Sequence, residues 1–193
     1  MVKSILNVAF NQSNLGHVFK VLGNFEKAME LIQKALENDL ANFGEKHPNV
    51  AAHYSNLSSV YSDLGDFKKA SDLLEKALKS DLENFGEKHP KVAVRRSNLA
   101  NVYKDLGDFE KARDVLEKAL ESNLANFGEK HPDVAVSQSS LGNIYQNLGD
   151  IGKAKDLYLK ALKIARQTWG EDHPNYKTIF KNLDDLENKI NKK

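Results

Sequence analysis

Residues 106–112 read Leu-Gly-Asp-Phe-Glu-Lys-Ala, and this segment occurs four times with small changes. The other copies are LGNFEKA from Leu22, LGDFKKA from Leu64 and LGDIGKA from Leu148. Successive copies are 42 residues apart. A second block keeps the same period, with FGEKHP at Phe43, Phe85 and Phe127 and WGEDHP at Trp169. Residues 51–92 and 93–134 are identical at 29 of 42 aligned positions. We infer that the sequence is built of duplicated repeats.

Each repeat is predicted to form two helices. Apolar residues recur at helical spacing in both halves, as at Leu99, Val102 and Leu106 and then at Ala112 and Leu116. Between the halves, Gly107 can adopt the positive φ that ends a helix, and Asp108 is a good N-cap for the next. His-Pro places a proline in the first turn of the following helix, where a missing N–H does no harm. In the third repeat the expected helices are 90–106 and 109–127.

A two-helix repeat cannot bury its apolar stripe alone, so neighbouring repeats must stack on one another. We therefore predict an all-α fold, a right-handed superhelical solenoid of tandem helix-turn-helix repeats in a single domain over residues 1–193. The expected repeats cover about 9–50, 51–92, 93–134 and 135–176. The acidic segment around Asp184, Asp185 and Glu187 suits a closing helix, over about 174–192, that shields the last repeat.

These residues resemble the tetratricopeptide repeat family. The family pattern of Leu, a small residue, Tyr, Gly, an aromatic residue, Ala, a bulky apolar residue and Ala is matched, in the second repeat, by Leu57, Ser58, Tyr61, Gly65, Phe67, Ala70, Leu74 and Ala77. The third repeat matches equally well. The fourth has Ile151 in place of the aromatic residue, and the large aromatic that often opens the motif is kept only as Tyr54. The 42-residue length and the Gly-x-x-His-Pro segment are similar to the kinesin light chain type of repeat.

The resemblance implies a ligand surface on the concave wall formed by successive first helices. The wall positions carry mostly Ser and Asn, and the candidate peptide-binding residues are Asn14, His17, Asn56, Ser59, Asn98, Asn101, Ser140, Asn143 and Asn182. A column of Asn at the 42-residue period, broken by Ser140, is similar to the asparagine ladder by which related repeats hold a peptide backbone. A carboxamide offers both donor and acceptor, as a peptide bond requires. The alternative is that these Asn side chains bond between adjacent repeats.

Two further features of the wall bear on the ligand. Basic residues are sparse there, with Lys20, Lys104 and Lys181 the nearest, so we do not expect recognition of an acidic C-terminus through a carboxylate clamp. Phe10 stands where the other repeats have Ala or Val, and it is either an anchor for an apolar side chain or part of an N-terminal edge without a preceding repeat.

The histidines suggest no catalytic or metal site. His47, His89, His131 and His173 occur once per repeat before proline, so one repeat step separates them, too far for a shared metal ion. Their expected role is at the start of a helix. His17 and His53 occur singly, and no Asp or Ser partner in register suggests triad chemistry. We predict that the protein is not an enzyme and has no cofactor.

Composition narrows the class of partner. Lys and Arg number 28 against 27 Asp and Glu, a net charge of +1, which favours neither nucleic acid nor a membrane surface. Cysteine is absent, no apolar run is long enough to span a bilayer, and Asn and Ser interrupt the N-terminal segment where a signal peptide would be apolar. We predict a soluble cytoplasmic protein that binds an extended segment of a protein partner on its concave surface. The alternative is a structural spacer or an array that associates with itself end to end.

Overall fold

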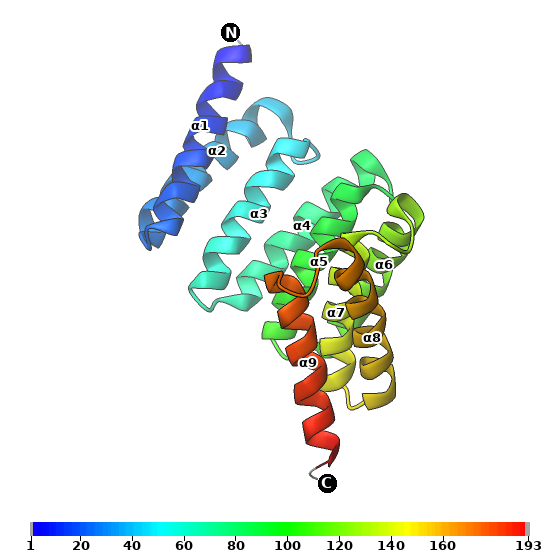
Figure 1. Ribbon diagram of the computed structural model, residues 1–193. Coiled ribbons are helices and arrows are strands. Elements are labelled where there is room, and N and C mark those ends of the chain that lie inside the picture. Colours follow the sequence, from blue (N-terminus) through cyan, green and yellow to red (C-terminus); the bar gives the residue numbers. More distant parts are fainter. Residues whose placement is uncertain (1, 192–193) are drawn as a thin grey trace. The chain divides into compact units, whose positions relative to one another are not determined.

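The computed structural model describes residues 2–191, and the side chains of residues 8–191. All regular structure in this range is α-helical, in nine helices (Figure 1). They are α1 (Val2–Val21), α2 (Phe25–Phe43), α3 (Pro48–Asp63), α4 (Phe67–Phe85), α5 (Pro90–Asp105), α6 (Phe109–Phe127), α7 (Pro132–Asn147), α8 (Ile151–Thr168) and α9 (Pro174–Asn191). The predicted all-α class of tandem helix-turn-helix repeats with a closing C-terminal helix is confirmed.

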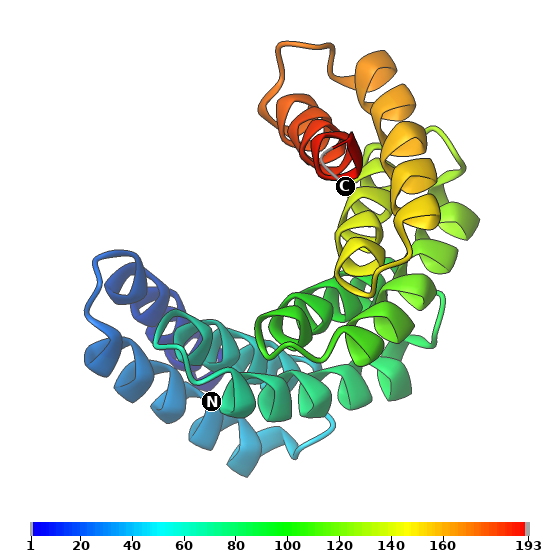
Figure 2. The same cartoon turned by 90° about the horizontal axis from the view of Figure 1, so that it is seen from below.

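The chain divides into two compact units, Met1–Glu87 and Lys88–Lys193. The first unit contains the hairpins α1–α2 and α3–α4. The second contains the hairpins α5–α6 and α7–α8, followed by α9. Within each unit the odd-numbered helices lie in one layer and the even-numbered helices in the other (Figure 2). We call them A and B helices. The assignment of residues 1–193 to one repeat domain stays a prediction.

Glycine and capping residues in the turns set the ends of the helices, as the sequence predicts. Gly107 has φ of 79° between α5 and α6, and the Asp108 side chain accepts a hydrogen bond from the backbone N–H of Lys111 at 3.2 Å. His131 caps α7 in a similar manner, since its Nδ1 accepts from the N–H of Asp133 at 3.2 Å. The first backbone donors of α6 and α7 are therefore satisfied by the residue that directly precedes each helix.

Small residues let the two helices of a hairpin approach closely. Ala28, Ala70, Ala112 and Ala154 are all fully buried at the same position of successive B helices. In α3, Ser58 faces this position, and its Oγ donates to the carbonyl oxygen of Ala70 at 2.9 Å. Larger side chains at these sites would push the hairpin apart.

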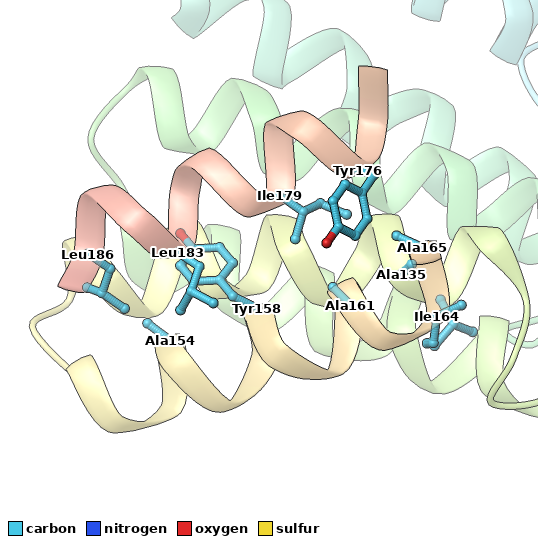
Figure 3. Close-up of a cluster of buried hydrophobic side chains, with 11 residues drawn as sticks. Ala135, Ala154, Tyr158, Ala161, Ile164, Ala165, Tyr176, Ile179, Leu183 and Leu186 are labelled. Atoms are coloured by element: carbon cyan, nitrogen blue, oxygen red, sulfur yellow. The ribbon is translucent and has the colours of Figure 1, made fainter. Parts of the chain in front are cut away.

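The closing helix α9 covers the end of the second unit with one apolar face. Tyr176, Ile179, Leu183 and Leu186 are 0–8% exposed and pack with Tyr158 and Ala161 of α8 (Figure 3). The opposite face carries the exposed Asp184 and Asp185. The helix thus buries the apolar stripe of the last repeat and presents acids to solvent.

Candidate functional site

The predicted site residues lie on the A helices, and we name each unit's set the A-helix wall. In the first unit the wall consists of Asn14 and His17 of α1 and Asn56 and Ser59 of α3. In the second unit it consists of Asn98 and Asn101 of α5, Ser140 and Asn143 of α7 and Asn182 of α9. Asn14, His17, Asn98 and Asn101 are exposed, and the other five are half-buried.

Two of the wall amides are engaged in contacts within the protein. The Asn56 Nδ2 of α3 donates to the Ser13 Oγ of α1 at 2.9 Å, which links two successive A helices. Asn143 Oδ1 accepts from the hydroxyl of Tyr158 at 2.7 Å, which links the two helices of one hairpin. Burial raises the pKa of Tyr158 to about 12, so this hydroxyl stays a donor at neutral pH. The Asn56 contact is of the kind that the alternative interpretation predicts, whereas the Asn143 contact lies within a single repeat.

The other wall amides differ from this pair. Asn14, Asn98 and Asn101 are exposed, and their side chains form no hydrogen bond within the described part of the chain. Asn98 and Asn101 lie three residues apart on α5 and therefore one helical turn apart on the same face. Val94, on the turn before, is 60% exposed, and Val136 at the same register of α7 is 45% exposed. This part of the wall offers two carboxamides beside apolar surface.

One prediction about the histidines is wrong, because His53 has both an Asp and a Ser partner. His53 Nε2 lies 3.0 Å from Asp39 Oδ2, and its Nδ1 lies 3.2 Å from Ser13 Oγ. The three side chains come from α3, α2 and α1, and they are 4%, 1% and 5% exposed. This Ser–His–Asp series is therefore buried between helices, where it connects neighbouring repeats. Sequence spacing alone misses it because the partners are 14 and 40 residues from His53.

The positions of Asp39 and His53 carry a different pair of residues in each later copy of the repeat. In the second unit, Asn123 of α6 donates through Nδ2 to Ser137 Oγ of α7 at 2.9 Å, with both residues buried. Ala165 of α8 and Ile179 of α9 follow, in one apolar cluster. The sequence places Asp81 and Arg95 at the remaining pair of positions. The joint variation of these two positions at the 42-residue period is the sequence signal that could have revealed the contact.

The repeated histidines cap A helices as predicted. His47, His89, His131 and His173 accept a backbone N–H two residues ahead through Nδ1, at 3.1–3.2 Å. Some also stack on the aromatic residue that ends the previous B helix, as His131 does on Phe127 with ring centroids 4.4 Å apart. Across residues 2–191, no group of three His, Asp or Glu side chains is arranged to hold a metal ion. Over the same range, no helix combines the length and apolarity that crossing a bilayer requires.

Comparison with known proteins places this repeat in a family. The tetratricopeptide repeat family matches residues 7–83, 92–167 and 133–187. The chain belongs to the tetratricopeptide repeat family. Tetratricopeptide repeats mediate protein–protein interaction, and the family is of a non-catalytic scaffold type. A search of the curated proteins gave no match.

Solved structures agree with the family and with the kinesin-light-chain type of repeat. The crystal structure of BtubC (BKLC) from P. vanneervenii is 29% identical, with a TM-score of 0.83, over 95% of this chain and 73% of that one. Two crystal structures of a kinesin-light-chain-like protein of Podosopora anserina, with nearly identical TPR-like repeats, are 21% and 22% identical. Their TM-scores are 0.84 and 0.82, with 95% of this chain and 86% and 87% of theirs covered. At this identity the likeness shows the fold.

Proposed function

We propose that this tetratricopeptide repeat protein is a non-enzymatic scaffold that binds an extended segment of a partner protein on its A-helix wall. The exposed pair Asn98 and Asn101 carries the proposal, since these carboxamides have no hydrogen-bond partner in the described part of the chain. Each can donate to a peptide carbonyl and accept from a peptide N–H. Val94 and Val136 supply apolar surface for the side chains of the bound segment.

The proposal gives the nine predicted residues different roles. Asn98, Asn101 and Asn14 are assigned to the partner's main chain, with His17, Ser59, Ser140 and Asn182 at the edges of the same walls. Asn56 and Asn143 hold neighbouring helices through Ser13 and Tyr158. The balanced charge supports a protein ligand over nucleic acid or lipid.

Peptide selection against the intact protein tests this function. Twelve-residue random peptides selected on the wild-type protein are measured against the double variant Asn98→Ala, Asn101→Ala. Loss of two hydrogen bonds should weaken binding by about 10- to 100-fold. The melting temperature should not change, because neither carboxamide forms a hydrogen bond within the described part of the chain.

A matched variant separates this effect from a general loss of amides. Gln33→Ala with Asn175→Ala removes two exposed carboxamides outside the proposed contact and should leave peptide affinity unchanged. Methylation of single backbone nitrogens in a selected peptide should abolish binding at the positions that contact α5. If the Asn98→Ala, Asn101→Ala variant binds every selected peptide as tightly as the wild type does, these two amides do not bind the main chain of the partner.

A second candidate function is self-association, and the outer face of α1 favours it. Val8, Leu15 and Val18 are 47–51% exposed, while Val50, Leu57 and Val60, at the same positions of α3, are 0–3% exposed. Phe10, 64% exposed, lies on the same helix. A face that is covered in the next repeat is thus open in the first.

Sedimentation velocity across a range of concentrations distinguishes the two functions. Self-association through α1 predicts a sedimentation coefficient that rises with concentration and stays constant in Leu15→Glu, Val18→Glu. A monomer at all concentrations would leave peptide binding as the function.

The expected cytoplasmic location also stays a proposal, supported by the absence of cysteine, and fractionation of the source cells tests it.

A further inference from the structure

The second unit contains a cavity whose lining includes no residue of the A-helix wall. It has a volume of about 510 Å³ and lies between α6, the loop before α7, and α8. Leu124 and Ile164 provide its apolar lining, and Lys130, Lys160 and Lys163 surround it together with a single acid, Glu129. Cavities of this size and mixed lining are typical of sites for small ligands or single side chains.

A buried polar atom of the cavity lacks a partner. Gln138 of α7 lines the cavity and is 9% exposed, and its Oε1 accepts no hydrogen bond within the described part of the chain. A buried acceptor without a donor is unfavourable, because it has lost its hydrogen bonds to water without gaining others. A ligand that brings an N–H or O–H to this oxygen would remove that cost.

The lysines of the cavity also lack acidic partners, with one exception. Lys160 forms an ion pair with Asp156 at 2.7 Å. Lys130 and Lys163 form none within residues 2–191. The cavity therefore has an excess of positive charge beside its unpartnered carbonyl oxygen.

In the first unit, the positions equivalent to those that line the cavity carry different side chains. Tyr54 occupies the position of Gln138 and is 6% exposed, with the Lys76 ammonium 5.6 Å from its ring centroid. Lys46, the equivalent of Lys130, pairs with Glu83 at 2.9 Å. Its carbonyl oxygen also accepts from Ser80 Oγ at 3.0 Å. There the aromatic ring fills the space and the acid neutralises the lysine.

In the fourth repeat all three of these features are changed together. Gln138 replaces the aromatic ring, Gln167 replaces the acid, and Ile164 replaces the hydroxyl donor. The substitutions hollow the site, release the lysine from its ion pair and leave an acceptor in the lining. Lys163 lines the cavity as well, at the position that Lys79 has in the first unit.

We propose that this cavity binds an acidic peptide group, with the carboxylate among Lys130, Lys160 and Lys163 and a neighbouring N–H donating to Gln138 Oε1. An apolar residue beside the acid packs on Leu124 and Ile164. The carboxylate comes either from an Asp or Glu side chain or from the C-terminus of the bound peptide. The site is separate from Asn98 and Asn101, so it adds a second contact for a protein partner and can be tested without the first.

Three short peptides serve as probes, with isotope-labelled full-length protein observed by NMR. Acetyl-Leu-Glu-Glu-Leu-amide carries side-chain carboxylates, acetyl-Leu-Gln-Gln-Leu with a free C-terminus carries only the terminal carboxylate, and acetyl-Leu-Gln-Gln-Leu-amide carries neither. One or both of the acidic probes should shift the side-chain amide signal of Gln138, and the neutral probe should not. Which acidic probe binds identifies the source of the carboxylate.

Variants that copy the first unit should close the site. Gln138→Tyr should fill the cavity and Gln167→Glu should pair with Lys130, each weakening the acidic probe at least about tenfold. Lys130→Ala with Lys163→Ala should do the same without filling the cavity. Lys79→Ala, at the position equivalent to Lys163 in the first unit, is the control and should have no effect.

Two results would overturn the proposal. One is the failure of both acidic probes to bind wild-type protein. The other is binding that survives Gln138→Tyr and the double lysine variant, since those variants should retain the helical spectrum and fold of the wild type. Unchanged binding in Asn98→Ala, Asn101→Ala is expected, so failure here and failure of the peptide wall are separate results.

Discussion

Gly142 illustrates how one residue of the repeat is matched to its neighbour. A Cβ on Gly142 would lie 2.8 Å from Cε1 and 2.9 Å from Cδ1 of Tyr158, whose side chain is fully buried. The equivalent pair in the third repeat is Ala100 with Leu116. The large ring of Tyr158 and the missing side chain of Gly142 therefore belong together.

Gly142→Ala should destabilise the protein by about 1–3 kcal/mol, because the buried ring has no room to move. Gly142→Ala with Tyr158→Leu recreates the pair of the third repeat, and it should recover part of that loss. Urea unfolding of the two variants measures the difference. A double variant less stable than the single one would contradict steric matching as the cause.

Glu30 gives a pH-dependent signature on the surface of α2. Its carboxylate accepts hydrogen bonds from Lys27 and Lys34, both at 2.7 Å, and these bonds lower its pKa from 4.5 to about 2. The stabilisation from the ionised carboxylate is therefore present above about pH 4.5 and is lost as the pH falls toward 2.

An NMR titration of Glu30 tests this cause directly. The midpoint should lie near 2 in the wild type and return toward 4.5 in Lys27→Ala, Lys34→Ala. An unchanged Glu30 midpoint would show that the two lysines do not cause the lowered pKa.

At the scale of elements, the junctions between repeats carry pairs of different chemistry at equivalent positions of the repeat. Asp39 and His53 join α2 to α3, Asn123 and Ser137 join α6 to α7, and Ala165 and Ile179 meet between α8 and α9. A carboxylate opposite Ser or Ile would lose its partner, and an unpaired buried acid is costly. The pairs thus favour the native order of repeats whose sequences would otherwise allow several.

A double-mutant cycle at the first junction tests this matching. His53→Ser alone leaves the buried Asp39 without the imidazole and should cost about 3–5 kcal/mol. Asp39→Asn with His53→Ser installs the pair found between α6 and α7 and should cost less than the single change. Urea denaturation measures the free energy of unfolding of the wild type, of His53→Ser and Asp39→Asn alone, and of the double variant. Strictly additive effects would mean that the two side chains are not coupled.

The helices were predictable because their signals are local. The hydrogen bonding of each amide of the A-helix wall was not predictable. Gly107 and Asp108 lie in the turn that they form, so the ends of α5 and α6 agree with the sequence to within one residue. Asn143 accepts a hydrogen bond only because the fourth repeat has Tyr158 where the third has Leu116. That partner is set by packing between helices, which residue spacing alone does not describe.

At the scale of the whole molecule, burial of the A helices is uneven. In α3, Val50, Leu57 and Val60 contribute to apolar clusters with α2 residues, among them Ile32 and Leu36. In α1 the equivalent apolar side chains are about half exposed. In an array whose stability is a sum of repeat and interface terms, a helix that lacks one interface opens more easily than the rest.

Native-state hydrogen exchange should therefore show lower protection of the backbone amides in α1 than in α3. Three half-exposed side chains forgo about 3 kcal/mol of burial relative to α3, which corresponds to protection factors about 100-fold lower. Leu15→Ala should change the free energy of unfolding by less than about 1 kcal/mol, whereas Leu57→Ala should cost about 2–5 kcal/mol. Because a second copy covering α1 would raise its protection, the exchange is measured at two protein concentrations. Equal protection of α1 and α3 at the lower concentration would contradict the argument, since burial would then not govern local stability in this array.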